Sequence, residues 1–517
     1  MSLKSFLSGA LVLLAAIPAM PQSRPALSQR IQQIVSQPQF KHAQFGIEFY
    51  DLDRKAVIFS LNGDKLFVPG STTKLLTEGA ALGLLGPDYR FHTRVYRVGT
   101  ITPEGVLNGD LVLVAGGDPN LSARVGPGDT LAYTDNDHSY AGWLPGTAVP
   151  GDPLVVLKDL AKQVASHGIK RVQGRVLVDA SLFSAGKTDP GTGAVISPVC
   201  LNDNVVDVSV FPGAHEGDSA SLMASPWLPY VAFINRVKTG KEDSDARFSF
   251  SSDIANPDGS HTVTVEGNIP AGWKSELAAY KVKDPVRFAE FAFNLALFTA
   301  GVQANLTPMD TQADFAALAA AYTPQNLVAE HVSAPLKAEV RLTLKVSQNL
   351  HAATMPYFLG AVLGQKHEGA LQAGFAAEQE FLKRAGLDLT AASQADGAGG
   401  PGAAFTPDFM VRYLAYLARQ PYGQIFYNSL PIMGRDGTLA EVLENSPAAG
   451  HIHAKTGTYI FYNELDRTSL LLSKGLVGYI DSRTGRKLAF AAFVNQVPGA
   501  DAEAVGEELA KIAAAAY

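Results

Sequence analysis

The chain has 517 residues, which is too long for a single hydrophobic core, so two or three domains are expected. Its 47% hydrophobic and 18% charged residues are typical of a folded enzyme and argue against intrinsic disorder. The net charge of −7 supplies no basic surface for nucleic acid or anionic lipid, so we expect no nucleic-acid partner.

The first 22 residues are typical of an export signal. A short start that contains Lys4 is followed by a mostly apolar stretch at residues 6–20. This stretch is too short and too interrupted by proline to span a membrane. We therefore expect an exported protein of the periplasm or cell envelope, with no integral membrane span in the mature chain. A buried N-terminal helix is the alternative.

The next segment alternates between helix and strand patterns. We expect a helix at residues 27–37, an antiparallel pair of strands at 45–50 and 57–61, and an apolar helix from Ser71 to Gly86. Between about residues 89 and 327 the pattern changes to short strands, turns and isolated helices. Two helices stand out there, one that stops at Gly168 and one that Asp284 caps.

After about residue 330 the first pattern returns. Helices are expected around Ser347, and a glycine-rich loop runs over residues 396–402. Three strands and a terminal helix follow, at 451–458, 476–480, 488–495 and from 502.

Terminal helices on an antiparallel sheet predict an α+β protein with an α/β-sandwich domain. A large mixed α/β insertion interrupts this domain. The predicted boundaries are a signal at 1–22, the sandwich domain at 23–88 and 330–517, one insertion subdomain at 89–110 and 196–329, and a nested subdomain at 111–195.

Ser71 and Lys74 are the most informative residues of the chain. They are three positions apart at the start of a helix, so their side chains share one face. The free N–H groups and partial positive charge of a helix N-terminus favour a developing anion there. A serine beside an amine in that setting can act as a nucleophile without histidine.

Two later motifs support the interpretation of Ser71 and Lys74 as a reactive pair. Ser347 and Asn349 form a Ser-x-Asn motif, and Lys455, Thr456 and Gly457 form a Lys-Thr-Gly motif. Each motif type also occurs a second time. The second copies are Ser184 with Lys187, Ser60 with Asn62, and residues 238–240, of which we interpret the first and the last as surface residues. Only the first set combines the order Ser-x-x-Lys, Ser-x-Asn, Lys-Thr-Gly with a separate structural context for each motif.

Neither the cysteine nor the histidines predict a metal site. Cys200 is the only cysteine and has apolar neighbours, so we expect its small side chain to be buried. His451 and His453 alternate along a strand pattern without a third ligand at a recognised interval. We expect no metal and no cofactor.

Taken together, these motifs resemble the class C low-molecular-mass penicillin-binding proteins. These proteins are D-alanyl-D-alanine carboxypeptidases and endopeptidases among the penicillin-recognising serine hydrolases. Ser71 and Ser347 are 276 residues apart (347 − 71), and this family carries a large insertion at that place. The matching segments are residues 71–77, 84–91, 116–119, 347–352, 437–439, 454–458 and 485–490.

The resemblance implies a role for each motif residue. Ser71 would attack the penultimate D-alanine of a peptidoglycan stem peptide and form an acyl-enzyme, which β-lactam antibiotics would inhibit. Lys74 would take the serine proton, which requires a neutral amine, and burial near a second cation favours that form. The other implied roles are proton relay by Ser347, positioning by Asn349, and carboxylate binding by Lys455, Thr456 and Thr458, next to Gly457. Backbone N–H groups of Ser71 and Thr458 would form the oxyanion hole.

Three departures from the family pattern put substrate preference in question. The usual serine of the 396–399 loop is Ala398, and Ala353 and Thr354 stand where an acidic residue is common. Residues 459–474 are expected to be a long aromatic link that reshapes the cleft. Two alternatives remain: a β-lactamase or esterase on the same scaffold, and a weakly active wall-binding protein.

Overall fold

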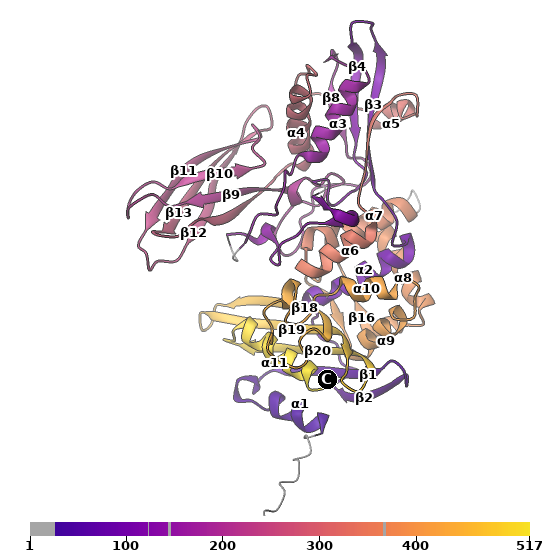
Figure 1. The fold of residues 1–517 in the computed structure, drawn as a ribbon, viewed down its shortest axis with the longest axis vertical. Helices are drawn as coiled ribbons and strands as arrows, with labels where there is room; N and C mark the ends of the chain where they lie inside the picture. Colours follow the sequence, from indigo (N-terminus) through magenta and orange to yellow (C-terminus); the bar gives the residue numbers. More distant parts are fainter. Residues whose placement is uncertain (1–25, 123, 143–145, 365–368) are drawn as a thin grey trace, which may run out of the picture.

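The structure is a computed structural model that describes residues 26–122, 124–142, 146–364 and 369–517. The expected signal at residues 1–22 lies outside the described residues. Figure 1 shows a sheet with helices packed against it, and a second group of strands and helices that extends away from it. The predicted α+β class is confirmed.

A five-stranded antiparallel sheet with the order β18-β19-β20-β1-β2 forms the base of the molecule. The two sequence ends of the domain pair directly, because Phe49 of β1 lies opposite Phe490 of β20 and their rings stack. Both strands alternate apolar side chains towards two buried faces, as the pattern predicts. The strands are β1 (Gln44–Asp51), β2 (Ala56–Leu61), β18 (Ile452–Asn463), β19 (Thr468–Asp481) and β20 (Lys487–Pro498).

Helices cover both faces of this sheet. The terminal helices α1 (Leu27–Val35) and α11 (Ala502–Ala514) pack together on one face. On the other face lie the turn η2 (Gly70–Thr73), α2 (Lys74–Leu85) and α9 (Pro407–Leu417), with further helices around α2. The further helices are α6 (Leu336–Val346), α7 (Asn349–Leu363), α8 (Ala370–Arg384) and α10 (Gly423–Ser429).

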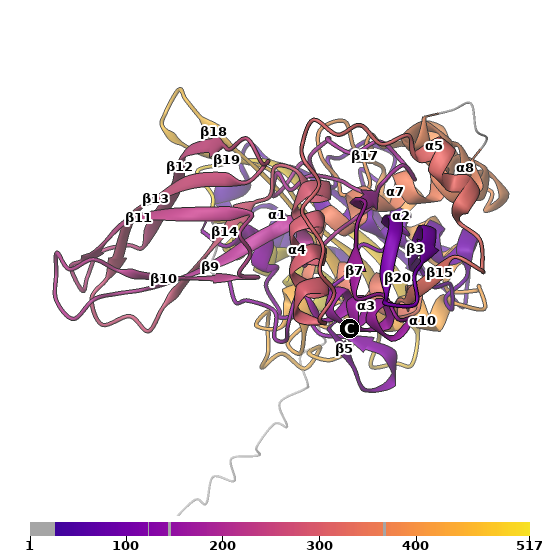
Figure 2. The ribbon, with the colours of Figure 1, turned by 90° about the horizontal axis from the view of Figure 1, so that it is seen from above.

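The insertion contains a sheet of its own with the strand order β15-β3-β4-β7, in which β8 also pairs with β4. Helices α3 (Val155–Ser166) and α4 (Pro285–Thr299) pack together beside it, and the side chain of Asp284 caps α4 as predicted. Figure 2 shows α4 between this group and the remaining insertion strands. The strands are β3 (His92–Ile101), β4 (Val106–Val114), β7 (Arg171–Val172), β8 (Val176–Asp179) and β15 (Leu327–Val332).

The insertion also contains two three-stranded sheets, β10-β9-β14 and β11-β13-β12 (Figure 2). Because β4 runs through the expected boundary between residues 110 and 111, a division there would cut a strand. We therefore propose that the insertion divides between the β3–β4 sheet and the segment from β9 to β14. These strands are β9 (Val205–Phe211), β10 (Ser221–Ser225), β11 (Val231–Gly240), β12 (Arg247–Ala255), β13 (His261–Pro270) and β14 (Glu276–Lys281).

The prediction of a link over residues 459–474 is wrong about the backbone. Most of it continues the two strands, because β18 runs on to Asn463 and β19 begins at Thr468. The apolar and β-branched side chains of this stretch favour strand over loop. The remaining turn projects from the sheet (Figure 1). Among the described residues, no helix is both long and apolar enough for a membrane crossing.

Candidate active site

Ser71 lies in the tight turn η2, directly before helix α2 and against strand β18. Gly70 has a φ of +53°, and a Cβ atom there would lie 2.8 Å from the backbone nitrogen of Thr458. Glycine therefore allows both the left-handed backbone and the close approach to β18. The hydroxyls of Thr72 and Thr73 donate to the carbonyls of Pro69 and Gly70, both at 2.9 Å, which holds the turn.

Lys74 is the buried first residue of α2, and its amine lies at the centre of the site. Its Nζ donates to Ser71 Oγ at 2.7 Å and to Asn349 Oδ1 at 2.5 Å. It also lies 3.3 Å from the carbonyl oxygen of Ala398 and 3.4 Å from Ser347 Oγ. Burial lowers the pKa of Lys74 to about 8, although nearby carboxylates, Asp189 first among them, act in the opposite direction.

Ser347 and Asn349 lie at the junction of α6 and α7. Ser347 has a left-handed backbone with a φ of +63° and ends α6, so α7 begins in a new direction at Asn349. The amide nitrogen of Asn349 donates to the hydroxyl of Tyr140, which comes from the insertion. The junction thus places a hydroxyl and an amide on either side of the Lys74 amine.

Lys455 completes the polar centre from strand β18. Its Nζ donates to Ser347 Oγ at 2.8 Å and to the carbonyl oxygen of Thr456 at 2.9 Å. Burial holds the pKa of Lys455 well below its usual value, and the neighbouring cations Lys74 and Lys474 lower it further. Two amines therefore share one serine hydroxyl, which disfavours the double positive charge.

The remaining residues of the Lys-Thr-Gly motif form the rim next to Ser71. A Cβ atom on Gly457 would lie 2.1 Å from the carbonyl oxygen of Pro69 and 3.2 Å from the nitrogen of Ser71. The hydroxyl of Thr456 donates to that of Thr438, and Lys474 Nζ donates to Thr458 Oγ1 at 2.9 Å. The other seven residues singled out from the sequence thus lie around Ser71.

Comparison with known proteins identifies the family of this chain. The model of the D-Ala-D-Ala carboxypeptidase 3 (S13) family matches residues 27–516. This chain belongs to the S13 family. The resemblance inferred from the motifs is therefore confirmed, and the protein is a serine-type D-Ala-D-Ala carboxypeptidase of the penicillin-binding class.

Individual relatives are similar over most of this S13 chain. The D-alanyl-D-alanine carboxypeptidase of Actinomadura sp. (strain R39) is 28% identical over 475 residues, which are 87% of this chain and 80% of that protein. DacB of Haemophilus influenzae, also named D-alanyl-D-alanine carboxypeptidase, is 23% identical over 470 residues, or 88% and 85% of the two chains. The crystal structure of penicillin-binding protein 4 (DacB) from H. influenzae superposes with a TM-score of 0.70 at 21% identity and covers 95% and 98% of the chains, which shows the fold.

The S13 site contains one residue that the sequence reasoning missed, Tyr140, and the 396–399 loop, which the sequence singled out only for its missing serine. Tyr140 lies on the short turn η4 (His138–Tyr140) of the insertion, and no local pattern marks it as a site residue. Asp396 accepts from the N–H groups of Ala398, Gly399 and Gly400 and so shapes the loop whose carbonyl faces Lys74. The missing serine at position 398 leaves this backbone contact in place.

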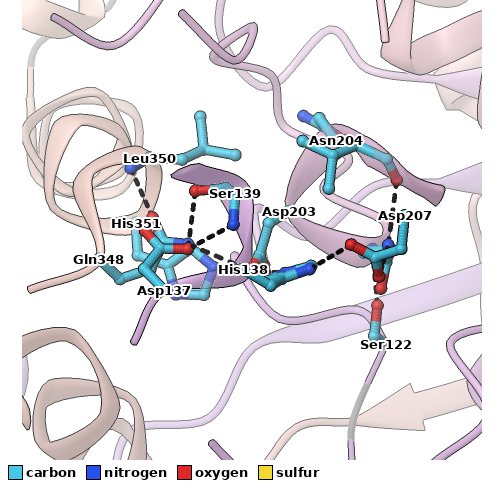
Figure 3. A network of polar contacts seen from close by, with 12 residues as sticks. Ser122, Asp137, His138, Ser139, Asp203, Asn204, Asp207, Gln348, Leu350 and His351 are labelled. Atoms are coloured by element: carbon cyan, nitrogen blue, oxygen red, sulfur yellow. Dashed lines mark hydrogen bonds and ion pairs between the residues drawn. The ribbon is translucent and has the colours of Figure 1, made fainter. Parts of the chain in front are cut away.

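A buried polar network joins the insertion to α6 and α7 (Figure 3). Asp203 contacts His138 Nε2 at 2.7 Å and His351 Nε2 at 2.9 Å. The other ring nitrogens contact Asp207 and Glu339, at 2.7 and 2.6 Å. Burial alone would raise the pKa of Asp203, but the two histidines hold this pKa well below its usual range. Conversely, Asp207 and Asp203 outweigh burial and raise the pKa of His138 to about 10.

Gln348, the middle residue of the Ser-x-Asn motif, connects this network to the site (Figure 3). Its amide nitrogen donates to Asp203 at 3.0 Å and to Asp137 at 3.2 Å. Its amide oxygen accepts from the backbone nitrogen of Leu350 at 2.7 Å and caps α7. The insertion therefore fixes the residue that separates Ser347 from Asn349.

Two groups in this network have the composition of metal ligands. The ligand atoms of Asp137, His138 and Asp203, and those of Cys200, Asp203 and His351, lie within 4.8 Å of one another. The histidine nitrogens already contact carboxylates at 2.7–2.9 Å, a hydrogen-bonding distance. We therefore interpret the cluster as a network of ion pairs, and the absence of a metal stays a prediction.

The second copies of the motifs lie elsewhere. Ser184 and Lys187 are exposed, and so is Lys238, which contacts Ser219 on the edge of the insertion. Ser60 donates to Glu48 on the far strands of the main sheet. As expected, Cys200 is buried, and His453 lies on β18, where its ring stacks on Tyr427.

Proposed function

We propose that Ser71 is the nucleophile with which this enzyme cleaves the D-Ala-D-Ala bond of peptidoglycan stem peptides. The observation that carries the proposal is the position of the Lys74 amine, 2.7 Å from Ser71 Oγ, in a site where burial lowers its pKa to about 8. A neutral amine at that distance can accept the hydroxyl proton.

Acylation then follows from the two amines and the three side chains that contact them, those of Ser71, Ser347 and Asn349. Ser71 Oγ bonds to the carbonyl carbon of the penultimate D-alanine while its proton passes to Lys74. The bond to the terminal D-alanine breaks, and its nitrogen receives a proton through the Ser347 hydroxyl, which contacts both amines. Asn349 holds the Lys74 amine in place. Water releases the acyl group and restores the proton to Ser71.

Charge stabilisation comes from the turn and the strand. The backbone N–H groups of Ser71 and Thr458 are suited to bind the oxyanion, because Gly70 and Gly457 let the turn approach β18 closely. Lys455, with the hydroxyls of Thr456 and Thr458, would hold the terminal carboxylate. An arriving carboxylate favours the protonated form of the Lys455 amine that burial otherwise disfavours.

Intact-protein mass spectrometry after incubation with penicillin tests the nucleophile. The wild-type chain should gain one stable penicilloyl group, and Ser71→Ala should gain none. An adduct on Ser71→Ala would refute the assignment. Rapid turnover of penicillin would instead favour a β-lactamase, and a folded chain without an adduct would favour a weakly active wall-binding protein.

The type of peptidase is a separate question. The proposal covers cleavage of the terminal D-alanine and of D-alanyl cross-links, because both place the same acyl group on Ser71. Digestion of purified muropeptides, with free D-alanine measured against cleaved cross-links, separates the two activities. The signal-like start supports export to the periplasm or cell envelope. Fractionation of the producing cells tests that location, and a chain confined to the cytoplasm would contradict it.

A further inference from the structure

Strand β18 continues past the catalytic rim into a hairpin with exposed apolar side chains on both faces. We call residues 459–467 the β18–β19 tip. Four of its large apolar residues are well exposed: Ile460 at 52%, Phe461 at 49%, Tyr462 at 60% and Leu465 at 94%. Such a concentration at one edge of a soluble fold marks an interaction surface.

The tip is an ordered turn whose polar side chains shape it. Asn463 Oδ1 accepts from the backbone nitrogen of Leu465 at 3.1 Å, and Asp466 Oδ1 accepts from the backbone and hydroxyl of Thr468. The apolar side chains do not close this turn. They are therefore available for contacts outside the chain.

The alternation along β18 directs part of the tip towards the catalytic face. Gly457 faces Ser71, and successive side chains of a strand point to opposite faces. Lys455 and Tyr459 therefore share the face of Gly457. The register with β19 shifts between Tyr459 and Ile460, and the ring contact with Tyr459 keeps Phe461 beside this face. The rings of Tyr459 and Phe461 meet edge to face, with centroids 5.2 Å apart, and form one aromatic surface beside the site.

The catalytic geometry also sets the direction of the substrate, and this step rests on the proposed function. The terminal carboxylate lies near Lys455 and Thr456, and the scissile carbonyl lies at Thr458. The upstream part of the stem peptide must then run beyond Thr458. It can do so along β18, which is the outer strand of its sheet. From Thr458 to Asn463, the strand spans about 17 Å.

We propose that the β18–β19 tip binds the upstream end of the substrate, namely the beginning of the stem peptide and the sugar that carries it. Aromatic rings suit this ligand because they offer apolar surface to the C–H faces of a sugar and to an extended peptide. A membrane fits less well, because Glu464 and Asp466 flank Leu465 and Arg467 is the only base of the tip. An anionic bilayer would repel this turn.

The test compares two substrates that differ only upstream of the cleaved bond. One is a short acylated peptide ending in D-Ala-D-Ala, and the other carries the same stem on a disaccharide. The variant is Tyr459→Ser with Phe461→Ser, which removes both rings of the aromatic surface, and the control is Ile254→Ser, an exposed apolar residue on β12 of the insertion. The acylation rate with penicillin reports on the integrity of the site.

The double variant should lose about tenfold in kcat/KM on the disaccharide substrate, mainly through KM, which corresponds to one lost contact surface of modest affinity. The short peptide, the penicillin rate and the control should change less than about twofold on the same scale. An equal loss on both substrates, or no loss on either, would overturn the proposal.

Vesicles of phosphatidylcholine and phosphatidylglycerol test the alternative, which is that the tip binds a membrane. If the wild-type chain binds them, the double variant does not, and cleavage of the disaccharide substrate is unchanged, the tip is a membrane surface and the proposal falls. Failure of the proposed function has a different signature: the wild-type chain would release D-alanine from neither substrate and form no penicilloyl adduct. That result would remove the basis of the docking proposal as well.

Discussion

Replacement of Lys74 by arginine tests whether a neutral amine activates Ser71. Arginine keeps the positive charge and the capacity to donate hydrogen bonds, but it does not lose its proton in proteins. General-base catalysis contributes about 10²- to 10⁴-fold to a rate. We therefore expect the acylation rate of Lys74→Arg with penicillin to fall by that range.

The pH dependence of the wild-type chain supplies the second half of this prediction. With a Lys74 pKa of about 8, the neutral fraction rises from about 0.1 at pH 7 to about 0.5 at pH 8 and about 0.9 at pH 9. The acylation rate should rise about tenfold across this range. Stopped-flow acylation with a chromogenic β-lactam measures it, and a flat profile together with an active Lys74→Arg variant would refute the reasoning.

The variant Asp396→Asn tests whether a neighbouring carboxylate raises the pKa of Lys74. The carboxylate of Asp396 is among the groups that raise the pKa of Lys74 against the effect of burial. Asparagine keeps an acceptor oxygen for the loop N–H groups but removes the charge. Asp396→Asn should therefore shift the rising limb of the rate profile to lower pH. A shift to higher pH would show that the Asp396 charge does not act on Lys74 as proposed.

Three further changes probe the framework of the site. Gln348→Leu removes two hydrogen bonds to carboxylates and should cost about 2–4 kcal/mol in urea unfolding; a loss below about 0.5 kcal/mol would contradict this. Gly457→Ala places a Cβ atom 2.1 Å from the carbonyl oxygen of Pro69, so penicillin acylation should fall at least about 100-fold while far-UV circular dichroism is retained. A rate within a few-fold of wild type would show that the turn tolerates the shift. Because the pKa of His138 is raised to about 10, its stabilising effect is complete below about pH 6.5 and lost towards pH 10. The difference in unfolding free energy between wild type and His138→Gln should accordingly shrink by several kcal/mol from pH 6 to pH 10, and a constant difference would argue against a charged imidazolium.

Local patterns in the sequence were sufficient to predict the elements that carry Ser71, the proposed nucleophile. The three-residue spacing of Ser71 and Lys74 fixes their contact on one turn, and the structure shows it at 2.7 Å. Alternation along residues 451–458 predicted the strand that carries Lys455. The order of the motifs related Ser347 to these residues, although no local rule could show that α6 ends in a left-handed residue there.

The tip of the β18–β19 hairpin shows where a comparison of lengths misled. The length of residues 459–474, which is unusual for the family, predicts a link. Their own composition, with Tyr459, Ile460, Phe461 and Tyr462 in succession, has high strand propensity. Periodicity and composition were the better guides to the backbone here.

The polar network could not be predicted, because it depends on contacts between distant segments. Gln348 and Asp137 are 211 residues apart in the sequence, and His351 and Asp203 are 148 apart. No periodic pattern marks isolated histidines and aspartates of this kind. Only the fold shows that the loops of the insertion meet the start of α7.

The contact between the insertion and the start of α7 gives the insertion a structural role in the site. An appended domain could be removed without leaving buried charges behind, but the buried His351 of the sandwich domain is paired both with Glu339 of the same domain and with Asp203 of the insertion. Loss of Asp203 would leave a buried imidazolium with one partner fewer, which is strongly destabilising. It would also free Gln348 and with it the backbone between Ser347 and Asn349. The insertion is thus part of the framework that holds the Ser347 hydroxyl and the Asn349 amide around Lys74.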